Sequence, residues 1–143
     1  MSISPKEFEN VSALSGVGRF SHFVKRVADW EELWSLRSPD GWVLRGDEGG
    51  GEYVPVWPRA EYALACATDI WADCAPAPIA LDEWFAKWTP GMAKDGRRVE
   101  VFPTPFASGL VLAPEELAQA LREECARYGD YDDCDGGPGG TGP

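Results

Sequence analysis

The chain has 143 residues, which is the size of one domain built around one hydrophobic core. Hydrophobic residues make up 44% of it and charged residues 26%, a composition typical of a globular protein rather than a disordered, collagenous or membrane chain. Its net charge of −11 repels phosphate backbones and anionic lipid, so we expect no nucleic-acid partner and no membrane partner.

The N-terminal third is expected to form a helix and then a hairpin. A serine followed by a proline opens the helix, and apolar residues spaced by three and four continue it over about residues 5–28. Gly16 and Gly18 mark a weak point or a break in it. Short apolar runs at 33–37 and 42–44, separated by a Ser-Pro-Asp-Gly turn, predict two paired strands.

The middle of the chain is expected to add a strand and two helices. Residues 52–58 are typical of a strand, and Pro55 within it cannot donate a ladder hydrogen bond, so we expect an edge strand or a bulge. One apolar face predicts a helix over 59–74, ended by the two prolines that follow. Asp82 can cap the next helix, which the Thr-Pro-Gly sequence at 89–91 is expected to close.

The last third is expected to contain two strands and the most clearly defined helix. Apolar residues predict strands at 99–102 and 109–112. A helix follows over 114–128, with Glu115 and Glu116 in its first turn, where the helix dipole favours anions.

These elements predict an α+β fold in which a mostly antiparallel sheet of about five short strands packs against three or four helices. We expect residues 1–129 to form a single compact domain and residues 130–143, acidic and then rich in glycine and proline, to form a flexible tail. The chain starts without a secretion signal, so we expect it in the cytoplasm.

The sequence predicts no catalytic residues and no metal site. His22 is the one histidine, and no nucleophile motif accompanies it. The gaps from Cys66 to Cys74 and from Cys125 to Cys134 are too wide for a zinc knuckle, so free thiols are expected.

Two further sequence patterns resemble ligand-binding loops but lack residues that such loops need, so no cofactor is expected. The glycines at 49–51 lack the lysine and hydroxyl residue of a phosphate-binding loop. Residues 131–142 resemble a calcium loop, but Tyr131 and Gly142 stand where oxygen ligands belong.

Seven tryptophans are the most distinctive feature of the sequence. Trp42, Trp57 and Trp88 lie beside turns or prolines, where they either belong to a core of large rings or form an exposed aromatic surface that anchors an interface. Prolines that stiffen nearby segments can border one groove with them, namely Pro55, Pro58, Pro103 and Pro105.

Several blocks of sequence resemble the bacterial family known as domain of unknown function 2750, over about residues 5–128. The blocks are Arg19-Phe20 with Phe23-Val24, Leu33 to Arg37, Gly41-Trp42, Val54 to Pro58, Trp84 to Met92, and Val101 to Pro105. This resemblance implies a bacterial, stand-alone compact domain and supplies no catalytic residues. A weaker similarity, of fold alone, is to the amino-terminal domain of serine-sensitivity-enhancing type proteins. Such domains occur as non-catalytic accessory or immunity-like modules, which favours binding over catalysis.

Two functional hypotheses follow. The first is a non-catalytic cytoplasmic protein-binding module with an adaptor or immunity-like role. The alternative is a small-molecule binding or enzymatic domain. Its pocket is lined by Trp42, Trp57, Trp88 and Phe102, and an anionic group is fixed by Arg37, Arg45 or Arg59. A homodimer through an edge strand at residues 53–56 is compatible with either.

Overall fold

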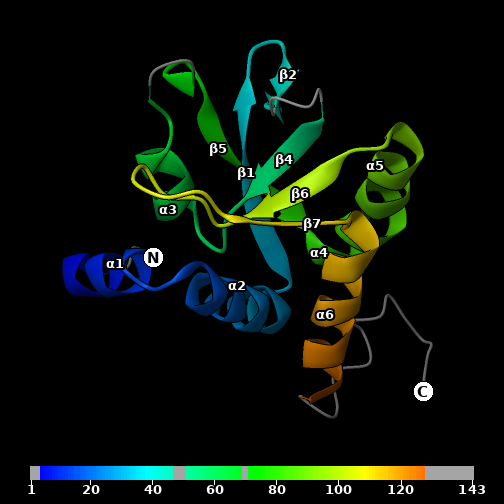
Figure 1. Cartoon of the computed structure of the whole chain (residues 1–143), viewed down its shortest axis with the longest axis horizontal. Helices are drawn as coiled ribbons and strands as arrows, with labels where there is room; N and C mark the ends of the chain where they lie inside the picture. The colour runs from blue at the N-terminus through cyan, green and yellow to red at the C-terminus, as the bar shows by residue number, and fades with distance from the viewer. Residues whose placement is uncertain (1–3, 47–50, 69–70, 128–143) are drawn as a thin grey trace.

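The computed structural model describes residues 4–46, 51–68 and 71–127 and confirms the α+β class (Figure 1). The helices are α1 (Pro5–Ser12), α2 (Gly16–Trp30), α3 (Ala60–Ala65), the continuous run of α4 (Leu81–Glu83), π-helical η2 (Trp84–Trp88) and α5 (Thr89–Asp95), and α6 (Pro114–Arg127). The strands are β1 (Glu32–Ser38), β2 (Gly41–Trp42), β3 (Arg45–Gly46), β4 (Glu52–Val56), β5 (Ala75–Ala80), β6 (Arg98–Val101) and β7 (Leu110–Leu112).

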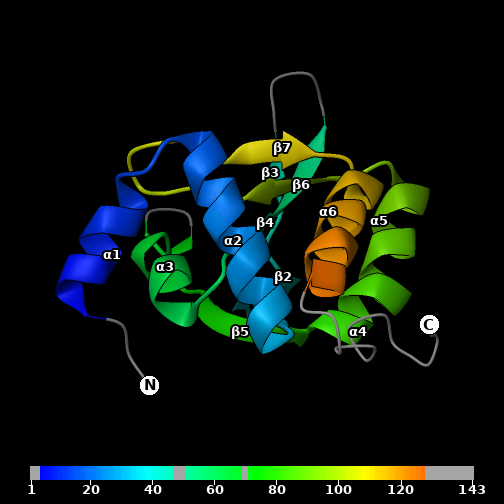
Figure 2. The same cartoon turned by 90° about the horizontal axis from the view of Figure 1, so that it is seen from below.

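The strands form two sheets that meet at a pair of tryptophans. One sheet has the order β2-β1-β5 and is antiparallel; the other has the order β3-β4-β6-β7, with β4 and β6 parallel. Trp34 and Trp57 exchange backbone hydrogen bonds of 2.9 and 2.8 Å, which joins β1 to the end of β4. Seen from below, α2 and α6 lie across the sheets (Figure 2).

The predicted first helix is broken in two. α1 ends at Ser12, and α2 starts anew at Gly16. The break has a local cause, since the Oγ of Ser15 accepts a hydrogen bond from the backbone N–H of Gly18 at 3.0 Å and so caps the second helix.

Strand β4 lies inside its sheet, so the expectation of an edge strand is wrong. β3 pairs with its first two residues, and β6 pairs with it along its length. Pro55 lies beyond the end of β3, and its carbonyl, which faces β1, accepts a hydrogen bond from the Ser35 hydroxyl at 2.7 Å. The Pro55 nitrogen also faces β1 and not β6. On that side no strand pairs with Pro55, so the missing N–H breaks no ladder hydrogen bond.

The helix predicted over 59–74 is much shorter, and a strand follows it. α3 ends at Ala65, and the two prolines expected to stop the helix belong to β5. They lie opposite Leu36 and Trp34, whose backbone groups bond away from β5, to Val43 and to Trp57. β5 is a sheet edge, so neither proline has to donate a hydrogen bond.

The helix expected to close at 89–91 instead continues to Asp95 and ends at Gly96, whose φ is 73°. The π-helical turn before Pro90 accounts for this, because it changes the hydrogen-bond pattern at the point where a proline ring would break an α-helix. The hydroxyl of Thr89 donates to the Trp84 carbonyl at 2.9 Å and strengthens this turn.

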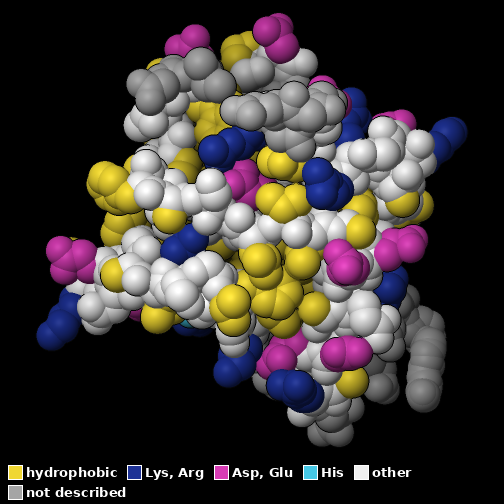
Figure 3. All heavy atoms as spheres, viewed as in Figure 1, with side chains coloured by type: hydrophobic (Ala, Val, Ile, Leu, Met, Phe, Trp, Pro, Cys, Tyr) yellow, Lys and Arg dark blue, Asp and Glu magenta, His cyan; other side chains and the backbone are white. Residues whose placement is uncertain are grey.

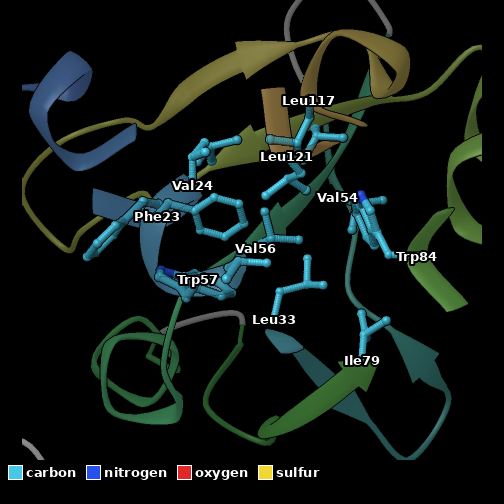
Figure 4. Packing of buried hydrophobic residues seen from close by; sticks show 14 of the residues in the cluster. Phe23, Val24, Leu33, Val54, Val56, Trp57, Ile79, Trp84, Leu117 and Leu121 are labelled. Carbon is cyan, nitrogen blue, oxygen red and sulfur yellow. The ribbon is translucent and has the colours of Figure 1, made fainter. Parts of the chain in front are cut away.

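The core lies between the sheets and the two long helices. Figure 4 shows Phe23 from α2 and Leu117 and Leu121 from α6 converging on Val54 and Val56 of β4. Each of these side chains is at most 3% exposed.

Cys66, Cys74 and Cys125 form no disulfide among the described residues, while Cys134 and the tail expected at 130–143 lie outside them. Among the helices in the described part of the chain, none is long and apolar enough to cross a membrane.

Candidate functional site

A hollow of about 330 Å³ opens beside two of the tryptophans that were predicted to form an interaction surface. The rings of Trp42 and Trp88 meet edge to face, with centroids 5.0 Å apart, and both residues are half-buried. We call this site the Trp42–Trp88 hollow. Its remaining lining consists of Leu44, Val54, Lys87, Gly91, Met92, Asp95 and Arg97.

Two distant elements bring these rings together. The β1–β2 hairpin places Trp42 opposite Arg37, directly after the turn. Trp88 is the last residue of η2, and its ring stacks on that of Trp84 with centroids 5.5 Å apart. Trp84 is fully buried, so it anchors the half-buried Trp88 ring to the core. The floor of the hollow is therefore fixed by packing.

Charged groups surround the apolar floor. Arg97 donates from Nε to Glu52 and from Nη1 to Asp95, both at 3.0 Å. The guanidinium of Arg37 lies 5.3 Å from the Trp42 ring centroid, on a face where a cation is attracted by the ring. Lys87, on η2, is well exposed. The rim thus offers both signs of charge around two aromatic rings.

Three of the predicted surface residues belong to the core instead. Trp57 and Phe102 are fully buried, and Pro55 is buried in β4. The indole Nε1 of Trp57 donates to the Pro103 carbonyl at 2.8 Å. The Trp57 ring is therefore buried, and its polar atom has a hydrogen-bond partner inside the protein. The prediction of one surface holding all three tryptophans is wrong for Trp57.

The other two predicted arginines lie elsewhere. Arg45 binds the buried carboxylate of Glu100. Arg59 lies over the Trp30 ring, 4.8 Å from its centroid, with its Nε 3.8 Å from Glu61. Neither lines the Trp42–Trp88 hollow, so of the three candidate arginines Arg37 alone contacts one of its rings.

Sequence reasoning missed the part of the site that α5 supplies. Gly91, Met92 and Asp95 line the hollow, but the Thr-Pro-Gly sequence at 89–91 predicts that the helix ends there. A signal was present, since apolar spacing continues from Trp88 to Met92 at the helical interval of four.

A family model described as "Protein of unknown function (DUF2750)" matches residues 20–121. The chain belongs to this family. No curated protein and no solved structure matches it. Every described residue that lines the hollow lies within the segment that the DUF2750 model matches.

The single histidine of this DUF2750 domain lies in an aromatic cluster. The His22 ring meets those of Tyr62 and Phe102, with centroids 6.4 and 6.3 Å away. Burial, and then the nearby Arg26, lower the pKa of His22, while Glu7 acts in the opposite direction. Its buried Nε2 and the buried Tyr62 hydroxyl lack hydrogen-bond partners among the described residues. No group of three or more acidic, histidine or cysteine side chains that could hold a metal ion occurs in that part of the chain.

Apolar surface is also exposed away from the hollow. Figure 3 shows hydrophobic side chains gathered where β7, α2 and α6 meet. Phe106, in the loop before β7, is 96% exposed, and Val17 on α2 is 69% exposed. Because β7 and not β4 lies at an edge of this sheet, the dimer expected through residues 53–56 lacks a free strand edge there. Dimerisation through another edge stays a prediction.

Proposed function

We propose that this DUF2750 domain is a non-catalytic protein-binding module of the bacterial cytoplasm. It holds one apolar or aromatic side chain of a protein partner in the Trp42–Trp88 hollow, in an adaptor or immunity-like role. The observation that carries the proposal is the pair of half-buried indole rings over an apolar floor, bordered by charges of both signs. Interfaces commonly combine such an aromatic centre with a polar rim.

The mixed charges around the hollow favour a protein over a free small molecule. Lys87, Arg97 and Asp95 place both signs of charge around an apolar floor of about 330 Å³, which suits a protein surface with groups of both signs better than a small ligand with one charged group. A protein surface can cover the charged rim and exclude water while one of its side chains fills the hollow. Burying one leucine or phenylalanine contributes about 1.5–3 kcal/mol, so the rim must supply the rest of a useful affinity.

Gly91 allows the hollow to be filled without strain. A Cβ added there meets nothing within 4 Å, and the residue lies on α5 in the hollow's lining. The Gly91→Leu variant therefore occupies the site and improves helix propensity. Gly16, at the start of α2, also has open space around it but does not line the hollow, so Gly16→Leu is the matched control.

The test compares the two variants with the wild type as baits in lysate of the source organism, followed by titration of the purified retained protein. We expect a protein that wild type and Gly16→Leu retain, that Gly91→Leu loses, and whose binding fails when its own apolar contact residue is changed to alanine. Equal retention by all three baits contradicts the proposal, as does retention of no protein.

A further inference from the structure

A second hollow, of about 260 Å³, has a different chemical character. It is bordered by β3, by Cys66, Thr68 and Trp71, and by the loop after β6. Figures 1 and 2 both show that loop beside α3. We call it the Arg45 hollow. Its lining consists of Arg45, Cys66, Thr68, Trp71, Pro103, Thr104 and Pro105.

Arg45 is held in this hollow by a buried carboxylate behind it. Its Nη1 donates to both oxygens of Glu100, at 3.1 and 3.2 Å. The backbone N–H of Gly109 fixes the same carboxylate at 2.9 Å. The Glu100 side chain is 2% exposed, whereas that of Arg45 is 42% exposed. Both contacts of Arg45 with described residues use Nη1.

This arrangement is costly if it serves stability alone. Burying a carboxylate carries a desolvation penalty that a single ion pair seldom exceeds, and an apolar pair of similar volume is often at least as stable. The Glu100 carboxylate does, however, hold the Arg45 guanidinium in a fixed position beside the hollow. A planar guanidinium held in this way suits the paired oxygens of a carboxylate or a phosphate.

The walls are also fixed before any ligand binds. The indole of Trp57 and the thiol of Cys66 both donate to the Pro103 carbonyl, at 2.8 and 3.5 Å. The Trp71 ring meets that of Trp57 edge to face, with centroids 6.5 Å apart. Burial raises the pKa of Cys66 to about 11, so at neutral pH the thiol adds no negative charge to the wall.

We infer that the Arg45 hollow binds a small molecule that carries a carboxylate or a phosphate monoester on an apolar or planar body. Arg45 receives the anionic group, and it is the one charged side chain among the described residues that line the hollow. Trp71 and the two prolines offer an apolar surface to the body of the ligand. At about 260 Å³ the hollow has room for a small metabolite.

The test is a nuclear magnetic resonance titration of the full chain with benzoate, phenyl phosphate and, as the uncharged match, benzyl alcohol. The reporters are the Trp71 indole N–H and the Arg45 Nε–H. We expect saturable shifts with at least one of the two anions and binding of benzyl alcohol weaker by about tenfold or more. Binding of one anion and not the other identifies which anionic group the site prefers.

Arg45→Gln is expected to abolish the shifts. Because it leaves Glu100 buried without its partner, the double variant with Glu100→Gln is measured beside it, and a urea transition establishes that each variant is folded. Arg26→Gln, which removes another arginine that contacts a tryptophan but lines neither hollow, is expected to bind as the wild type does. The inference is overturned if neither anion shifts the reporters, if benzyl alcohol binds equally well, or if binding survives in the folded double variant.

Discussion

Replacing Arg19 with methionine is expected to lower the free energy of unfolding by about 3.5–5 kcal/mol. The Arg19 side chain is 4% exposed and donates to three backbone carbonyls. They belong to Phe102 at 2.9 Å, Leu14 at 2.6 Å and Ser108 at 2.9 Å. These bonds connect the start of α2 to the loop after β6, where Phe102 has the unfavourable φ of 61°.

The size of this loss in the free energy of unfolding follows from how exposed the three acceptor carbonyls are. The Phe102 carbonyl is buried, so losing a charged donor there costs about 1.5–3 kcal/mol. The other two bonds are partly buried, and water can replace the donor, so about 1 kcal/mol each is expected. Methionine keeps most of the apolar packing of the arginine stem.

Urea denaturation followed by circular dichroism measures this effect. With a slope of about 2 kcal/mol/M, the midpoint is expected to fall by about 2 M. Lys25→Met, an exposed change on the same helix, is the control and is expected to shift stability by no more than about 0.5 kcal/mol. A loss below about 1 kcal/mol for Arg19→Met would refute the claim that these bonds fasten the loop.

Three other predictions concern stability. Gly109→Ala would press a Cβ against the Val101 carbonyl oxygen, so we expect a loss of about 1–3 kcal/mol in the same urea assay, and an unchanged midpoint would count against this close approach. Gly91→Ala, with open space on a helix, should raise stability by about 0.4–1 kcal/mol, seen as a higher Tm; a lower Tm would show that the site is strained. Burial raises the pKa of Cys66 from 9.0 to about 11 and that of Tyr62 from 10.0 to about 12. The unfolded chain therefore releases these protons first, and stability should fall as the pH rises above about 9; Cys66→Ala should remove the earlier part of that fall, and a flat alkaline profile in the wild type would contradict the burial.

Local sequence signals predicted the elements whose causes are local. The Ser-Pro-Asp-Gly turn gave the β1–β2 hairpin, in which Arg37 pairs with Trp42. Pro114 and the acidic first turn gave α6, which begins at Pro114. In these cases the turn or the cap depends on neighbouring residues alone, so the sequence contains the whole explanation.

Predictions failed where a distant strand or helix decides the outcome. The two prolines of β5 end a helix in isolation, but β1 offers them positions at which no donor is needed. Pro90 ends a helix in isolation, but the π-helical turn before it lets the chain continue. Trp57 beside a proline is typical of an exposed site, yet its acceptor, the Pro103 carbonyl, lies on another strand's loop.

The candidate site could likewise be predicted only where its causes are local. Trp42 and Trp88 were identified because each lies beside a turn or a proline, which the sequence shows directly. Their meeting at 5.0 Å depends on how the hairpin packs against η2, and no short-range pattern contains that information. The contribution of α5 to the hollow was missed for the reason that its helix was predicted to end too early.

The claim that the Trp42–Trp88 hollow accepts a single apolar side chain can be tested without a known partner. The measurement is a nuclear magnetic resonance titration of the wild type with N-acetyl-leucinamide and N-acetyl-phenylalaninamide, in which the indole N–H signals of Trp42, Trp88 and the distant, exposed Trp30 are followed. The account predicts saturable shifts at Trp42 and Trp88, none at Trp30, and their loss in Gly91→Leu but not in Gly16→Leu. Unmoved Trp42 and Trp88 signals, or equal shifts in Gly91→Leu, would contradict it.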